Sequence, residues 1–173
     1  MKKKYLIVIA DYYKDIAKGL LDSALKLIPK TNTVKIIKVP GVFEIPVTIS
    51  KNIKKYDAFL ALGCVIKGQT PHFDFISQAS TNAIMDLSVV NKKPIGNGII
   101  TCLNMKQAKV RRKKGAEAAD AVLSLVHRAA LPVNQPAALQ PVQDGGHRGL
   151  AELHFPGDGA DGDVSHARNG CQD

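Results

Sequence analysis

The sequence of 173 residues contains no apolar run that approaches the roughly 20 residues needed to span a bilayer, which excludes a membrane-spanning protein. Its three cysteines, Cys64, Cys102 and Cys171, are too few and too scattered for a disulfide framework or a zinc knuckle. The basic start is followed by only a short apolar stretch, residues 5–10, before Asp11. Secretory signals need about 7–15 such residues, so we expect a first β-strand and a cytoplasmic protein with no membrane partner.

Lysine and isoleucine are absent after Val126, whereas proline, glycine and alanine accumulate there. Such a composition buries too little apolar surface to offset the entropy lost on ordering. We therefore predict one folded domain over residues 1–131 and a tail, residues 132–173, that is mostly disordered and carries no function. The GDGADGD stretch of this tail lacks the closing glutamate of an EF-hand, and its histidines lack ligand spacing, so we expect no metal.

Positive charge is concentrated in the first part of the chain. Residues 1–127 carry 21 Lys and Arg against 9 Asp and Glu, a net charge of +12, whereas residues 128–173 carry −3. A positive surface favours anionic ligands. A nucleic-acid binder would need basic residues interleaved with aromatic residues on one face. The lysines are instead spread along the predicted helices, and we expect no nucleic-acid partner.

Strand and helix patterns alternate along residues 5–130. Short apolar runs predict strands at residues 5–10, Thr33–Val39, Ala58–Ile66 and Ile95–Cys102. Helices are predicted at residues 14–28, 46–55 and 71–90, and at 105–130 with a break at Lys114-Gly115. This order predicts an α/β fold, a three-layer α/β/α sandwich around a four-stranded parallel sheet. Ligands bind beyond the carboxyl ends of such strands, which selects the segments after residues 10, 39, 66 and 102.

The segment after the third strand predicts an anion site with a proton-transfer group. Thr70 is typical of a helix N-cap and Pro71 of the first helical position. The free N–H groups of a helix start attract anions, and Gly68 permits close approach. His72 would lie in the first turn, where a neutral ring can accept and return a proton near pH 7. A surface histidine at a helix start is the plainer alternative.

Other candidate residues follow the first two strands. Glu44 is placed in a loop between apolar residues, where a polyol, a ring N–H or a structural hydrogen bond would satisfy it. Phe43 could fill the core, and Tyr12 could stack on a planar heterocycle or simply pack. Cys64 lies inside an apolar strand, which favours a buried, inert thiol over a nucleophile.

Four segments together resemble the lumazine synthase family: VPGVFEIPV (39–47), ALGCVIKGQTPHFDFIS (61–77), KPIGNGIIT (93–101) and KGAEAADA (114–121). The resemblance covers about residues 4–130 and implies a flavodoxin-like sheet. It also implies a transferase of riboflavin biosynthesis. That enzyme condenses 5-amino-6-(D-ribitylamino)uracil with 3,4-dihydroxy-2-butanone 4-phosphate to 6,7-dimethyl-8-ribityllumazine, phosphate and water, without a cofactor. A homologue that binds lumazine or flavin without turnover is the alternative.

The resemblance implies the following site. Tyr12 stacks on the pyrimidine, the ribityl chain contacts Val42, Phe43 and Glu44, and the pyrimidine edge meets backbone groups of Cys64, Val65 and Ile66. Gln69 and Thr70 hold phosphate, and His72 transfers protons. A neighbouring subunit contributes Asn97, Arg111 and Lys114 to the site, because family members form pentamers.

Three departures from the family pattern bear on assembly and phosphate binding. Tyr12-Tyr13 replaces a Phe-Asn pair, and Asn97 stands at a position that is often aromatic. The stretch between Arg111 and Lys114 is short, which leaves either Arg111 or Arg112 as the phosphate ligand. This bend and an N-terminal extension, which we do not find in this sequence, shape the contacts of family members that assemble into sixty-subunit shells. We therefore expect a homo-oligomer, a pentamer or decamer, rather than sixty subunits.

A receiver domain is disfavoured because Cys64-Val65-Ile66, not an aspartate, ends the third strand.

Overall fold

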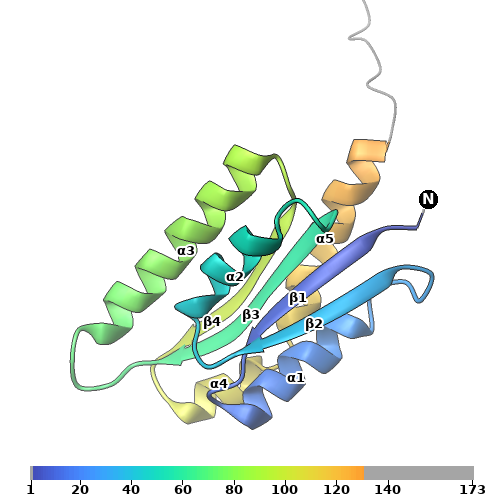
Figure 1. Ribbon diagram of the computed structural model, residues 1–173. Helices are drawn as coiled ribbons and strands as arrows, with labels where there is room; N and C mark the ends of the chain where they lie inside the picture. Colours follow the sequence, from blue (N-terminus) through green and yellow to red (C-terminus); the bar gives the residue numbers. More distant parts are fainter. Residues whose placement is uncertain (1, 131–173) are drawn as a thin grey trace, which may run out of the picture. The chain divides into compact units, whose positions relative to one another are not determined.

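The computed structural model describes residues 2–130, and the predicted tail lies outside them. The described part alternates strands and helices from end to end (Figure 1). Its elements are β1 (Lys4–Ala10), α1 (Lys14–Leu25), β2 (Thr33–Val39), α2 (Glu44–Asn52), β3 (Ala58–Ile66), α3 (His72–Asn91), β4 (Ile95–Cys102), α4 (Met105–Arg111) and α5 (Gly115–Ala130). All four predicted strands and the break between the last two helices are confirmed.

The four strands form one parallel sheet in the order β2-β1-β3-β4. In this register Val8 of β1 lies between Ile37 of β2 and Ala61 of β3. The two central strands are covered on both faces, so six of the seven residues of β1 are buried. The chain reverses its direction of progress across the sheet between β1 and β3. In flavodoxin-like sheets, the carboxyl ends at this reversal form the ligand-binding crevice.

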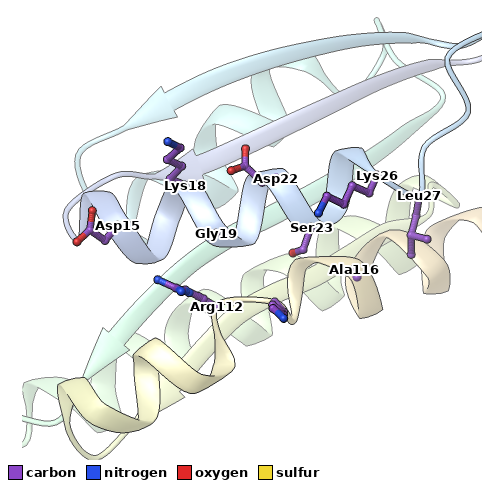
Figure 2. Close-up of a pocket in the computed structure, with 10 residues that line it drawn as sticks. Asp15, Lys18, Gly19, Asp22, Ser23, Lys26, Leu27, Arg112 and Ala116 are labelled. Carbon is purple, nitrogen blue, oxygen red and sulfur yellow. The ribbon is translucent and has the colours of Figure 1, made fainter.

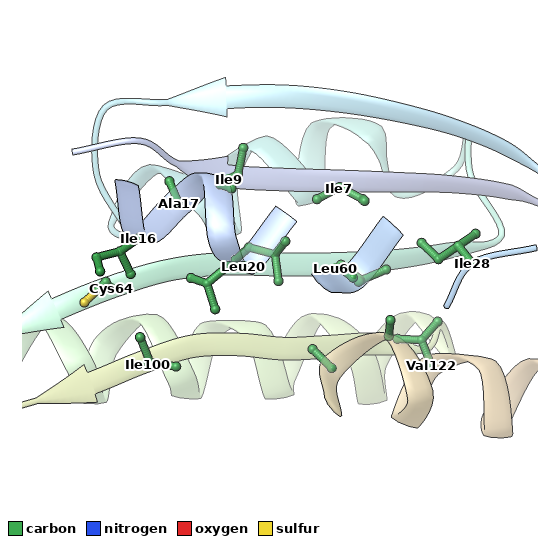
Figure 3. Packing of buried hydrophobic residues seen from close by; sticks show 14 of the residues in the cluster. Ile7, Ile9, Ile16, Ala17, Leu20, Ile28, Leu60, Cys64, Ile100 and Val122 are labelled. Carbon is green, nitrogen blue, oxygen red and sulfur yellow. The ribbon is translucent and has the colours of Figure 1, made fainter. Parts of the chain in front are cut away.

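Helices cover both faces of the sheet, as the strand-helix order predicts. One core joins Ile7, Ile9 and Leu60 to Leu20 of α1 and Val122 of α5 (Figure 3). The opposite core contains alternate residues of the same strands, packed against α2 and α3. Figure 1 shows α2 and α3 on one side of the sheet and α1, α4 and α5 on the other. The fold is therefore a three-layer α/β/α sandwich with a flavodoxin-like parallel sheet.

Two helix starts differ from the prediction. The helix α3 begins at His72, with Pro71 rather than Thr70 at its N-cap and no side-chain capping bond. The Pro71 carbonyl accepts hydrogen bonds from the N–H groups of Asp74 and Phe75, at 3.0 and 3.3 Å. Because these first bonds go to the Pro71 carbonyl, the cap falls one residue later than predicted, and Pro71 is not the first helical residue. The helix α2 begins at Glu44, so this residue opens a helix and does not lie in a loop.

Helix α1 ends at Leu25, three residues before the predicted end. Residues 26–28 form a turn, and the buried Ile28 side chain still belongs to the core beside α1. The helical spacing of apolar residues in the sequence therefore continues three residues beyond the last residue of the helix.

None of the helices described within residues 2–130 combines the length and the hydrophobicity that a membrane span requires.

Candidate functional site

A cavity of about 500 Å³ lies at the carboxyl ends of β1 and β3, and we call it the β1–β3 cavity. Eight of the predicted site residues line it: Tyr12, Val42, Phe43, Glu44, Cys64, Val65, Ile66 and His72. They come from the segment after β1, the segment leading into α2, the end of β3 and the first residue of α3. The reversal of the chain between β1 and β3 thus brings together residues that are up to 60 positions apart in the sequence.

Two aromatic side chains on the wall of this cavity are left open to solvent. Tyr12 is 75% exposed and Phe43 is 61% exposed. The alternative in which Phe43 fills the core is wrong, because the neighbouring Val42 takes the buried position. Tyr13 packs against the core and meets Tyr12 edge-to-face, with ring centroids 4.9 Å apart. This contact braces Tyr12 and leaves its ring able to stack on a flat heterocycle.

A carboxylate from Glu44 and an imidazole from His72 line the β1–β3 cavity, each at the first residue of a helix. The half-buried Glu44 carboxylate lies over Gly41, and no donor among the described residues bonds to it. It remains a free acceptor for hydroxyl or ring N–H groups. The exposed His72 side chain lines the same cavity.

Gln69 and Thr70 lie in the exposed loop between β3 and α3 and do not line the cavity wall. The loop is open, since a methyl group added at Gly68 would meet no atom within 4 Å. These two residues therefore lie in the loop between Ile66 and His72, which both line the cavity, but are not themselves among its walls.

A second cavity, of about 430 Å³, runs along the sheet edge formed by β4, and we call it the β4-edge cavity. It brings together the remaining predicted residues: Asn97, Arg111 and Lys114. The Asn97 Oδ1 atom accepts a hydrogen bond from the Ile99 N–H at 3.0 Å, which fixes its amide. The Lys114 ammonium lies 2.8 Å from a carboxylate oxygen of Glu117, one helical turn further on. The two cavities have no lining residue in common.

The two neighbouring arginines at the end of α4 point to different places. Arg111 lines the β4-edge cavity with Lys114 and Asn97. Arg112 lines a cavity of about 700 Å³ between α1 and the α4–α5 bend (Figure 2). Its aliphatic stem covers Gly19, where an added Cβ would lie only 2.9 Å from the Arg112 Cβ. Packing on α1 thus separates Arg112 from the other predicted anion ligands.

That larger cavity is lined by charged side chains of both signs on the surface of α1, including Asp15, Lys18 and Asp22. Of the residues considered for the site it contains only Arg112, the alternative to Arg111 as phosphate ligand. We therefore place the candidate site at the two smaller cavities, where the predicted residues collect.

Cys64 lines the β1–β3 cavity, but its thiol is a poor nucleophile. Its side chain is buried, and burial raises the pKa of the thiol to about 12, with a further contribution from the neighbouring Cys102. Nucleophilic attack requires the thiolate, which is scarce at neutral pH under these conditions. The structure supports the prediction of an inert thiol.

We expect Cys64 to resist alkylation by iodoacetamide at pH 8 in the folded protein. With a pKa of about 12, only roughly one thiol in 10,000 is ionised at that pH. Mass spectrometry of the peptide that carries Cys64, in native buffer and in urea, measures the difference. Labelling in native buffer as fast as in urea would contradict this assignment.

Two residues beside the β4-edge cavity were not predicted from the sequence. Glu117 pairs with Lys114, and Gln107 contacts Arg111. The i, i+3 spacing of Lys114 and Glu117 is a known signal for a helical pair. The Asn-x-x-Gln spacing of Asn104 and Gln107 resembles a capping box, which signals a helix start. Within the described residues, no group of three or more His, Cys, Asp or Glu side chains could hold a metal ion.

Comparison with known proteins identifies the family of this site. The model of the 6,7-dimethyl-8-ribityllumazine synthase family matches residues 2–130. The chain belongs to this family. A 6,7-dimethyl-8-ribityllumazine synthase of Methylorubrum extorquens (strain PA1) is 40% identical over 153 residues, covering 81% of this chain and 86% of the relative. The enzyme of Agrobacterium fabrum (strain C58) is 41% identical over 140 residues, covering 73% and 95%.

A third relative, 6,7-dimethyl-8-ribityllumazine synthase 1 of Rhodopseudomonas palustris (strain CGA009), is 42% identical over 136 residues, covering 71% of this chain and 83% of the relative. The predicted resemblance over residues 4–130 is thereby confirmed. The family match spans residues 2–130, so both cavities lie inside the 6,7-dimethyl-8-ribityllumazine synthase part of the chain.

Proposed function

We propose that this chain condenses 5-amino-6-(D-ribitylamino)uracil with 3,4-dihydroxy-2-butanone 4-phosphate to 6,7-dimethyl-8-ribityllumazine, phosphate and water. Family membership over residues 2–130 supports the activity. The observation that carries it to this chain is the β1–β3 cavity, which collects an exposed aromatic ring, a free carboxylate and a histidine. These are the groups needed to hold a pyrimidine with a polyol tail and to move protons beside it.

In this proposal the β1–β3 cavity binds the pyrimidine substrate. The Tyr12 ring stacks on the heterocycle, and backbone groups of the β3 end, at Cys64, Val65 and Ile66, meet its polar edge. The ribityl chain lies along Val42 and Phe43, and the Glu44 carboxylate accepts hydrogen bonds from its hydroxyl groups. A free, half-buried acceptor is suited to this because a bound hydroxyl restores the bonds it lacks.

The β4-edge cavity supplies cations for the phosphorylated substrate. Arg111 offers two parallel N–H groups that match a phosphate, and Lys114 adds a point charge. Gln69 and Thr70 contribute from the loop before α3. The reaction then proceeds by addition of the amine to the ketone, loss of water to the imine, elimination of phosphate, and closure of the ring by the ribitylamino nitrogen on the remaining carbonyl with loss of a second water. His72 accepts and returns protons in these steps, and holding two reactants in register supplies much of the acceleration.

We propose that the complete site forms between two copies of the chain, in a pentamer or a decamer. The two cavities have no common wall, and β4 lies at an open edge of the sheet. Large apolar side chains on α3, among them Phe75, Val89 and Val90, are also left exposed on one chain. A neighbour that covers such surface could present its β4 edge to the β1–β3 cavity.

Multi-angle light scattering is expected to give a pentamer of 18.6-kDa chains, about 93 kDa, or twice that mass. The apolar surface left on one chain favours association through the hydrophobic effect. A single-chain mass would contradict the shared site, and a particle above a megadalton would contradict the pentamer or decamer.

Of the two arginines, Arg111 is expected to be the phosphate ligand. The Arg111→Ala variant should raise the KM for the phosphorylated substrate roughly tenfold, as expected for the loss of a charge-assisted hydrogen bond. The Arg112→Ala variant, which removes a side chain packed on Gly19, should leave this KM unchanged. Steady-state kinetics at saturating pyrimidine substrate measures both. A larger rise in this KM for Arg112→Ala than for Arg111→Ala would indicate that the phosphate binds on the α1 side of the α4–α5 bend.

The activity itself is tested by mixing purified protein with both substrates and following the absorbance and fluorescence of the lumazine product. We expect product formation to be faster than the spontaneous reaction in the same buffer and to scale with protein concentration. Protein that binds the lumazine product but leaves the rate unchanged would contradict the proposal and establish the non-catalytic alternative.

A further inference from the structure

One side-chain oxygen at the start of α4 accepts hydrogen bonds from two donors. The Gln107 Oε1 atom accepts a hydrogen bond from the Leu103 N–H at 2.9 Å and from the Arg111 Nη1 atom at 3.4 Å. The Gln107 N–H in turn donates to the Asn104 Oδ1 atom at 3.0 Å, which caps the helix. The amide of Gln107 is thus tied to the backbone on one side and faces the guanidinium on the other.

This arrangement determines where the Arg111 side chain lies before any ligand binds. Gln107 and Arg111 are four residues apart in α4, so their side chains lie on one face of the helix. A long arginine side chain loses conformational freedom when it grips a ligand, and prior placement reduces that loss. The Leu103 contact makes the acceptor rigid, because an amide oxygen bonded to backbone cannot swing away.

The neutral charge of Gln107 is as important as its position. Lys114, the other cation of the β4-edge cavity, is already paired with Glu117. Among the ion pairs of residues 2–130, Arg111 has no carboxylate partner. A glutamine holds the guanidinium without neutralising it, so the full positive charge stays available to an anion. A glutamate at the same place would hold it more firmly and cancel that charge.

We propose that Gln107 is a positioning residue that holds the Arg111 guanidinium toward the phosphate of the phosphorylated substrate while leaving its charge intact. The inference rests on the proposed function, because it takes the β4-edge cavity as the phosphate site. Gln107 acts through Arg111 and does not itself touch substrate. A substitution at Gln107 should therefore change the KM for the phosphorylated substrate and not the KM for the pyrimidine substrate.

Two variants of Gln107 separate positioning from helix capping. Gln107→Met keeps the shape of the side chain and removes the acceptor, and we expect it to raise the KM for the phosphorylated substrate about fivefold. Gln107→Glu keeps both acceptor contacts but cancels the charge, and should raise this KM at least as much. The KM for the pyrimidine substrate should stay unchanged in both variants. A purely structural role predicts instead that Gln107→Glu behaves like the wild type.

Asn104→Ala is the matched control, because it removes the cap of α4 without removing the Gln107–Arg111 contact. It should lower stability and leave the KM unchanged. A double-mutant cycle completes the test: in an Arg111→Ala background, Gln107→Met should have no further effect on the KM.

The outcomes distinguish the two proposals. If the wild type turns over and Arg111→Ala raises the KM but Gln107→Met does not, the role of Gln107 is refuted and the proposed function stands. Additive effects of Gln107→Met and Arg111→Ala would likewise refute it. If the wild type does not turn over its substrates, the proposed function fails, and the inference about Gln107 fails with it.

Discussion

Replacing His72 with alanine is expected to lower kcat about 100-fold, the low end of the range for general acid–base catalysis, because the ring is exposed on one chain. The ring lies at the first residue of α3 on the wall of the β1–β3 cavity, where it can reach a bound substrate. The fold and the assembly should not change, since an exposed ring contributes little to the core. Steady-state kinetics and light scattering measure the two effects separately.

His127→Ala provides the control for this variant. His127 is also exposed, but it lies near the end of α5, where its ring contacts the Leu123 carbonyl at 2.8 Å. Its removal should leave kcat unchanged. Added imidazole should restore part of the activity of His72→Ala, because a free ring can take over the proton transfer. A His72→Ala variant with wild-type kcat would exclude this residue as the proton-transfer group.

The Gly115→Ala substitution is expected to lower the free energy of unfolding by about 3 kcal/mol, at the upper end for overpacking. Gly115 begins α5, and a Cβ there would overlap the Leu20 carbonyl oxygen of α1. That atom is backbone and cannot rotate away, so α1 and α5 must move apart. Because the bend before Gly115 carries Arg111 and Lys114, binding of the phosphorylated substrate should weaken as well.

Gly68→Ala is the matched comparison, since a Cβ at Gly68 would meet nothing within 4 Å. Urea unfolding followed by circular dichroism should give a wild-type midpoint for Gly68→Ala and a much lower one for Gly115→Ala. Equal midpoints for the two variants would show that α1 and α5 do not pack as closely as described.

The strands and the layer order could be predicted because they depend on local apolar runs and on the general rules of parallel sheets. The bounds of β2, β3 and β4 agree with the prediction for this reason. Helix starts were harder, as the segments at Glu44 and Thr70 illustrate. A cap depends on which carbonyl accepts the first bonds, and at α3 the backbone of Pro71 takes that place. Local residue preference alone could not decide it.

The resemblance supplied the candidate site residues and assigned three of them to a neighbouring subunit, but the local sequence could not show how these residues pack. The exposure of Phe43 depends on Val42 taking the buried position, and the choice between Arg111 and Arg112 depends on Gly19, more than 90 positions away. The contact between Gly19 and Arg112 is long-range and leaves no pattern in the local sequence. The contact of Gln107 with Arg111 is local, and its i, i+4 spacing could have been recognised beforehand.

The most direct test of the shared site is to mix two impaired variants in one oligomer. His72→Ala and Arg111→Ala chains, co-expressed with different tags and purified through both, form particles that contain both chains. A site built from two neighbours then has its histidine and its arginine intact at about one quarter of positions under random mixing. Assayed at a concentration of the phosphorylated substrate far below its KM, the mixed particles are predicted to recover about that fraction of wild-type activity, more than twice the activity of either parent. Activity no higher than the average of the two parents would contradict a site shared between subunits.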